Sequence, residues 1–88
     1  RVQMALDKHR LQAWPYPGKV AIREYHAETG RSAVHVVDQW CLLGSVEDEA
    51  ELGRLLEALP ARRFELDTYR ILQRWLETPT GRGAVTPL

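Results

Sequence analysis

The fold class follows from residues 19–43, which read KVAIREYHAETGRSAVHVVDQWCLL. Lys19 to His26 predicts a strand, with Val20, Ile22 and Glu24 on one face and Lys19, Ala21, Arg23 and Tyr25 on the other. Residues 27–32 include Gly30, which tolerates a positive φ, and they predict a hairpin loop. Ala33 to Leu43 is rich in β-branched and aromatic residues and predicts the longest strand.

On the N-terminal side of this hairpin, the sequence predicts a third strand. Arg10 to Trp14 largely alternates polar with apolar residues, and Pro15 to Gly18 is typical of a turn. A three-stranded antiparallel meander is the simplest sheet that accommodates these segments. Residues 1–8 have helical spacing and predict the last turns of a helix.

Two helices are predicted after the strands. Ser45 is the candidate N-cap of the first helix, because Asp48 follows three residues later, and Pro60 ends the helix. Asp67 is the candidate cap of the second helix, which Thr78 and Pro79 stop. The apolar stripes are Leu52, Leu55, Leu56 and Leu59 in the first helix, and Tyr69, Leu72, Trp75 and Leu76 in the second, with Ile71 at its edge.

The expected fold is therefore α+β, a small three-stranded antiparallel sheet with two to three helices packed on one face. We expect a single domain over residues 1–78 and a flexible tail over residues 79–88, where glycine and proline are frequent. The chain has 88 residues, so it has room for one core and little room for an enclosed active site.

Composition excludes several classes of protein. The 12 basic residues balance the 12 acidic ones, whereas a free-standing nucleic-acid binder usually has a basic excess. Cys41 is the single cysteine, so neither an internal disulfide nor a cysteine-rich zinc site can form, and a reducing cytoplasm fits best. No apolar run approaches the roughly 20 residues that cross a membrane. The chain begins at Arg1, so we expect a fragment of a larger protein.

Catalytic chemistry has little support in the sequence. Glu24 and Asp38 lie on neighbouring predicted strands and form the one candidate pair of metal-binding carboxylates, with exposed strand charges as the alternative. The acidic cluster of Glu47, Asp48, Glu49 and Glu51 points in different directions around a helix and cannot share one ion. The three histidines, His9, His26 and His35, lack the spacing of a helical metal site. We expect no catalytic residue, no bound metal and no cofactor.

Binding has more support, in two groups of side chains. Arg70 and Arg74 are four residues apart on one helix and are therefore neighbours, and with Arg62 and Arg63 they form a candidate phosphate-contacting edge. Nearby acidic residues could instead pair with these arginines. Trp14 and Tyr16 are candidates for base stacking, although core packing is the commoner use of aromatic side chains in a small domain.

Three segments together carry a family resemblance. Residues 14–24 (WPYPGKVAIRE), 34–46 (VHVVDQWCLLGSV) and 64–72 (FELDTYRIL) resemble the C-terminal region of Cho-type excinucleases, which are relatives of the nucleotide-excision nuclease UvrC. They are equally similar to the C-terminal region of bacterial fusion proteins that join a polymerase III epsilon-like 3′–5′ exonuclease to a GIY-YIG endonuclease domain. The cleavage motifs of those families do not occur in this chain.

The resemblance implies a non-catalytic C-terminal accessory module of a bacterial DNA repair or proofreading nuclease. Such a module would position the upstream nuclease domains of the same chain on DNA or on a repair or replication protein. One alternative is direct DNA binding through the arginine-rich edge. A second alternative is a structural domain that forms a weak homodimer through its sheet, and a third is a cryptic enzyme centred on Glu24 and Asp38.

Overall fold

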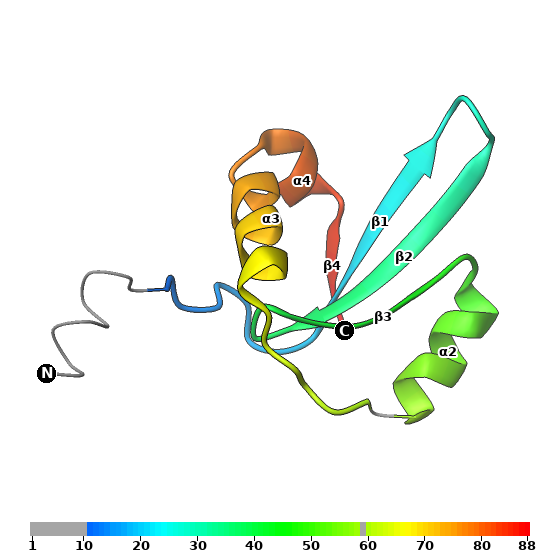
Figure 1. The fold of residues 1–88 in the computed structure, drawn as a ribbon. Helices are drawn as coiled ribbons and strands as arrows, with labels where there is room; N and C mark the ends of the chain where they lie inside the picture. The colour runs from blue at the N-terminus through cyan, green and yellow to red at the C-terminus, as the bar shows by residue number, and fades with distance from the viewer. Residues whose placement is uncertain (1–10, 59) are drawn as a thin grey trace, which may run out of the picture.

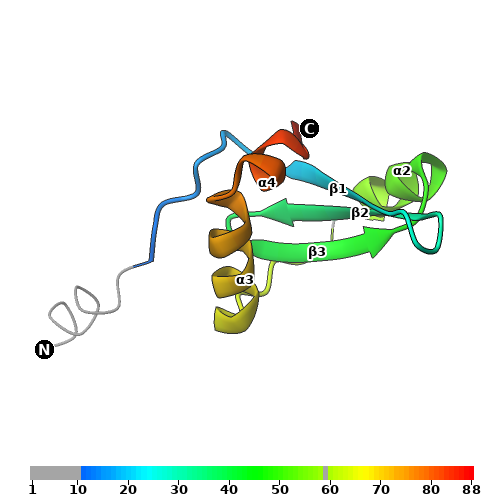
Figure 2. The ribbon, with the colours of Figure 1, turned by 90° about the horizontal axis from the view of Figure 1, so that it is seen from above.

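A four-stranded antiparallel sheet forms the centre of the domain. The computed structural model describes residues 11–58 and 60–88. In chain order the elements are β1 Val20–His26, β2 Arg31–Asp38, β3 Cys41–Val46, α2 Glu49–Ala58, α3 Leu66–Leu76, α4 Pro79–Gly83 and β4 Val85–Pro87 (Figure 1). The strand order is β3-β2-β1-β4, so β3 and β4 form the edges (Figure 2). The α+β class is confirmed, with four strands where three were expected.

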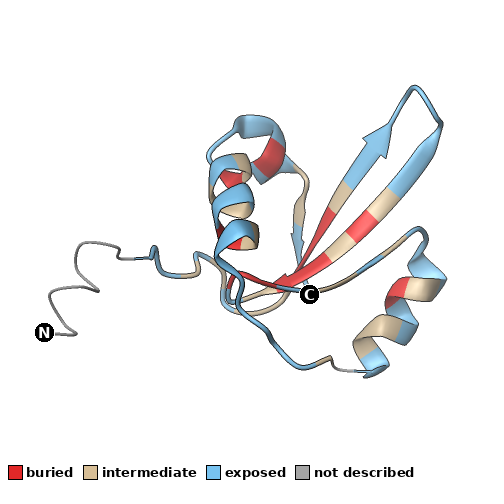
Figure 3. Ribbon diagram, in the orientation of Figure 1, coloured by how far each residue is buried: buried red, intermediate tan, exposed pale blue. Residues whose placement is uncertain are grey.

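β1 and β2 form the hairpin that the sequence predicts. They pair in register from Val20 opposite Val37 to His26 opposite Arg31. Gly30 lies in the loop with a φ of 69°, a conformation that costs a glycine little because it has no Cβ. The buried residues lie in the half of the hairpin away from this loop, and the loop end is exposed (Figure 3).

The prediction of one long strand from Ala33 to Leu43 is wrong, because the chain reverses within it. Gln39 and Trp40 form a two-residue turn between β2 and β3, with φ values of 51° and 66°. Two consecutive positive φ angles are typical of a type I′ turn, which favours Asn and Gly. Neither residue type is present, so the usual sequence signal is missing. Burial of the Trp40 side chain, which is 6% exposed, compensates for the strained backbone.

The strand predicted from Arg10 to Trp14 is also wrong in its described part, because Leu11 to Trp14 has no strand partner. The rest of that prediction, and the helix predicted before it, lie outside the described residues. The Gln12 amide donates to the Tyr69 hydroxyl at 2.8 Å, and its carbonyl accepts from Trp40 Nε1 at 2.8 Å. Side chains thus satisfy the backbone N–H and C=O groups of Gln12, which a strand would have paired with a neighbouring strand. The third strand of the meander is β3 instead.

α2 begins later in the chain than predicted. Ser45 belongs to β3 and is not an N-cap. Asp48 takes that role, because its Oδ1 accepts a hydrogen bond from the Glu51 amide at 2.8 Å. The pattern of a cap followed three residues later by an acid therefore occurs twice, and the second copy is used. Leu52, Leu55 and Leu56 face the sheet as predicted, and Leu59 lies outside the described residues.

α3 buries the predicted apolar stripe without the predicted cap. Its N-cap is Glu65, whose side chain makes no capping hydrogen bond. Asp67 instead lies in the first turn, where its negative charge is favourable at the positive end of the helix dipole. Tyr69 and Leu76 are buried and Ile71 is 69% exposed, which confirms the predicted orientation of the helix.

α2 and α3 cover opposite faces of the sheet, so the prediction that the helices pack on one face is wrong (Figure 1). β1 and β2 carry consecutive apolar residues, and a strand that is apolar on both sides needs cover on both sides. The α2 face contains Ala21, Val34 and Val36, and the α3 face contains Val20, Ile22 and Val37.

Residues 79–88 form α4 and β4 in place of the expected flexible tail. Thr78 follows the end of α3 and caps α4, since its Oγ1 accepts from the Gly81 amide at 2.9 Å. β4 pairs antiparallel with β1, with Val85 opposite Ile22. The last residues are thereby hydrogen-bonded into the sheet as an edge strand.

Candidate functional site

An open groove lies between α3 and the sheet, on the face opposite α2. Its volume is about 290 Å³, at the small end of ligand pockets, which span roughly 300 to 1,000 Å³. Ile71 is 69% exposed and Leu42 is 45% exposed, so apolar surface faces solvent along its walls. Ile22, Val37, Leu72 and Trp75 line the rest of its apolar part.

One end of the groove is polar, where Glu24 and His35 line it, and both belong to a chain of hydrogen bonds across three strands. His35 Nε2 lies 2.7 Å from Glu24 Oε1, and His35 Nδ1 lies 2.7 Å from the Ser45 hydroxyl. His26 Nε2 is 3.6 Å from the same Glu24 oxygen. In the neutral imidazole, Nε2–H donates to the carboxylate and Nδ1 accepts from the hydroxyl. The network therefore presents hydrogen-bond acceptors to solvent.

The hydrogen bond from His35 lowers the pKa of Glu24 below its ordinary value of 4.5, and the positive charges that His35 and His26 carry when protonated act in the same direction. Burial opposes the shift. A carboxyl whose folded pKa is depressed stabilises the fold above its unfolded pKa, and this contribution is lost as pH falls through the folded pKa.

We therefore expect Glu24→Gln to lower the free energy of unfolding at pH 7 by no more than about 1 kcal/mol, because the pair faces solvent. The difference from the wild-type chain should shrink as pH falls below about 4.5. Urea unfolding at pH 7 and pH 3.5 measures this difference in the free energy of unfolding. The control is Glu28→Gln in the exposed hairpin loop, and an equal, pH-independent effect of the two substitutions would contradict the assignment.

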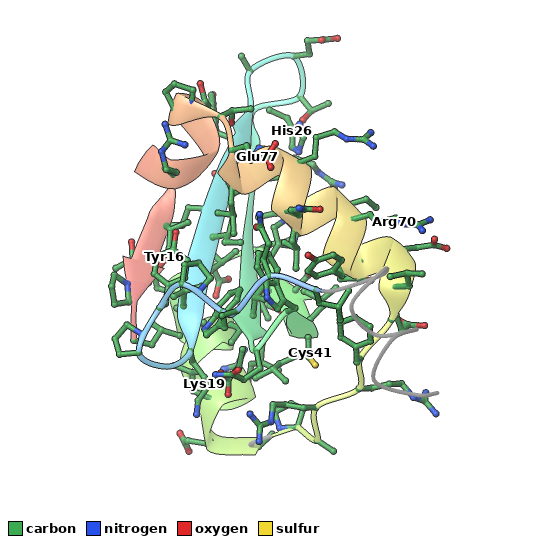
Figure 4. The ribbon with its side chains drawn as sticks, turned by 90° about the vertical axis from the view of Figure 1, so that its left-hand side faces the viewer. Tyr16, Lys19, His26, Cys41, Arg70 and Glu77 are labelled. Carbon is green, nitrogen blue, oxygen red and sulfur yellow. The ribbon has the colours of Figure 1, made fainter. Side chains whose placement is uncertain are left out.

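The four candidate arginines lie in two parts of the chain, two before α3 and two within it. Arg62 lies in the segment before α3, and its Nη1 is 3.7 Å from Asp38 Oδ2. Arg63 is exposed in the same segment. Arg70 and Arg74 are exposed on α3, and Arg70 points away from the sheet (Figure 4). Arg70 and Arg74 lie four residues apart on α3 and are therefore neighbours on the helix surface.

Trp14 and Tyr16 belong to the core. The Trp14 ring is edge-on to Tyr16 at 5.3 Å and to Trp40 at 5.1 Å between centroids. Its Nε1 donates to the Gly18 carbonyl at 2.9 Å. Both side chains are half-buried, with Tyr16 beside the sheet (Figure 4). Core packing therefore describes Trp14 and Tyr16 better than base stacking does. The tryptophan that lines the groove is Trp75.

Glu24 and Asp38 do not approach each other. Glu24 lies on the α3 face with His35, whereas Asp38 lies on the α2 face near Arg62. Within residues 11–58 and 60–88, no group of three or more histidine, cysteine or acidic side chains is placed to hold a metal ion. None of the helices in these ranges is long and apolar enough to span a membrane.

The groove itself was not predicted from the sequence. The sequence pattern indicates a helix cap at Ser45, the interior of a strand at Leu42 and only a core stripe at Trp75. Glu24 and Ile22 are two residues apart on one strand and therefore lie on the same face of the sheet. The cross-strand pairing of His35 with Ser45 would have identified the remaining polar side chains at this end of the groove. That pairing could not be inferred without the turn at Gln39.

Comparison with known proteins identifies the family. Residues 19–88 match the model of the excinuclease Cho C-terminal domain. The chain is 36% identical over 72 residues to excinuclease Cho of Escherichia coli O6:H1, 35% to that of Escherichia coli K12 and 32% to that of Salmonella typhi. Each alignment covers 82% of this chain and 23% of the relative, so the chain spans about a quarter of their length. No match was found among solved structures. The matched region is the C-terminal domain of these excinucleases and not their catalytic part, and the chain belongs to the excinuclease Cho C-terminal domain family.

Proposed function

We propose that this domain is a non-catalytic accessory module that positions a bacterial DNA repair or proofreading nuclease on DNA. The nuclease part would be a GIY-YIG endonuclease, an epsilon-like 3′–5′ exonuclease or both, acting in the cytoplasm. Contacts with a repair or replication protein, and weak pairing of two copies, remain further proposals for the same module.

The observation that carries the proposal is the position of Arg70 and Arg74. They lie one turn apart on the exposed side of α3, adjacent to Ile71 at the groove. Two guanidinium groups at this spacing can contact phosphate oxygens of one strand. The balanced charge of the chain fits an accessory role, in which a few contacts orient the DNA and the rest of the nuclease supplies most of the affinity.

We expect the isolated chain to bind a labelled single-stranded oligonucleotide weakly at low salt, with affinity that falls as salt rises. Arg70→Ala with Arg74→Ala should weaken this binding several-fold. It should also reduce the slope of log affinity against log salt by about 0.7 for each phosphate that the variant no longer neutralises. Fluorescence anisotropy at several salt concentrations measures both quantities.

The control is Arg31→Ala with Arg54→Ala, which removes the same charge from the β1–β2 loop end and from α2. This pair should leave the slope nearly unchanged. Binding that is absent at low salt, or that the two double variants weaken equally, would refute the role given to α3.

A further inference from the structure

We propose that the groove between α3 and the sheet holds one unstacked base of single-stranded DNA, with the N–H groups of the base facing Glu24. The inference rests on the proposed function, because it assumes that α3 contacts the DNA backbone. It gives the groove a ligand of its own, because phosphate contacts by Arg70 and Arg74 do not require that the groove be occupied.

The apolar part of the groove suits a flat ring. Its volume of about 290 Å³ accommodates a single base with part of its sugar. Two planar side chains, the indole of Trp75 and the imidazole of His35, line it together with Ile71. Stacking of a base on such a ring is worth roughly 1–3 kcal/mol and is tolerant of sequence. Exposed Ile71 and Leu42 would lose water when a base enters.

The polar end of the groove supplies selectivity. Glu24 Oε1 receives the His35 ring, whereas in the described residues no hydrogen bond involves Oε2. A carboxylate accepts hydrogen bonds and donates none. Guanine carries two adjacent N–H donors on its pairing edge, while thymine carries one donor between two carbonyl oxygens, which the carboxylate repels. The groove should therefore prefer guanine to thymine.

The distribution of charge favours a nucleotide over a peptide. Arg70 and Arg74 are next to Ile71 around α3, on its exposed side outside the groove, and Glu24 lines the polar part of the groove. A nucleotide has its anionic phosphate outside and its N–H groups at the far end of the base, in the same order. A peptide segment would need an acidic group outside and a basic group inside to match both.

The test compares an octamer of thymidine with the same octamer carrying one central dG, both labelled and titrated at low salt. We expect the wild-type chain to bind the dG octamer about 10-fold more tightly, as a hydrogen bond to a charged group implies. Glu24→Gln should reduce this preference to less than about 2-fold while thymidine binding remains. The control, Glu28→Gln, should retain the preference, and circular dichroism confirms that both variants fold.

Equal affinity of the wild-type chain for the two octamers would overturn the inference, as would a preference that survives in Glu24→Gln. A groove that binds a protein partner instead of a base would also leave the affinities for the two octamers equal. If binding is still salt-dependent and sensitive to Arg70 and Arg74, the proposed function stands without the base site. If neither octamer binds at low salt, the proposed function fails first and the base site fails with it.

Discussion

Replacing Gly81 with alanine is expected to destabilise the domain by at least about 3 kcal/mol. A Cβ at this position would lie 2.0 Å from the Trp75 carbonyl oxygen and 2.8 Å from its carbonyl carbon. Both atoms belong to the backbone of α3, so the clash is relieved only by moving α4 away from α3. The total stability of a domain of this size is about 4–13 kcal/mol, and the loss is a large fraction of it. Urea unfolding followed by circular dichroism measures the change.

Gly83→Ala is the matched control for this prediction. Gly83 lies in the same helix, and a Cβ at this position would meet no atom within 4 Å beyond the neighbouring residues and the backbone of its own helix. Alanine should therefore be neutral or stabilise the domain by up to about 1 kcal/mol, because it restricts the unfolded chain. Similar effects of the two substitutions would show that α4 does not pack closely against the end of α3.

The segments that the sequence predicted correctly are those whose signal is local. β1 follows from the strand predicted over residues 19–26, and the loop after it follows from Gly30. α2 and α3 follow from apolar residues at helical spacing, and the same spacing makes Arg70 and Arg74 neighbours. In each case the residues that carry the signal lie within one element or one turn.

The features that were missed depend on contacts between distant residues. The turn at Gln39 and Trp40 has no Asn or Gly, and it is held by the Trp40 indole against Gln12 and Tyr69. β4 forms because β1 offers a free edge at Ile22, which no property of the last residues reveals. The groove needs the turn in particular, since the turn places Leu42 beside α3.

One error could have been avoided from the sequence. Val36 and Val37 are consecutive, as are Val20, Ala21 and Ile22, so both faces of these strands carry apolar side chains. A strand of this kind is buried on both sides. The pattern therefore indicates helices on opposite faces of the sheet, in disagreement with a single layer of helices.

Trp40→Ala is the other substitution for which we expect a large effect, about 3–5 kcal/mol of lost stability. The indole is 6% exposed, packs edge-on against Tyr69 at 4.9 Å and against Trp14 at 5.1 Å, and donates to the Gln12 carbonyl at 2.8 Å. Removing it leaves a cavity in the aromatic core and an unpaired carbonyl. Urea unfolding gives the difference from the wild-type chain.

A second variant at the same position tests the turn separately from the core. Glycine usually destabilises a folded chain more than alanine does, because it gains more freedom on unfolding. Trp40 has a φ of 66°, where alanine is strained by roughly 1–2 kcal/mol and glycine is not. Trp40→Gly should therefore be at least as stable as Trp40→Ala, although it removes more of the side chain. If the glycine variant is clearly the less stable of the two, Trp40 does not have a left-handed backbone conformation. The turn between β2 and β3, which places Leu42 at the groove, would then be incorrect.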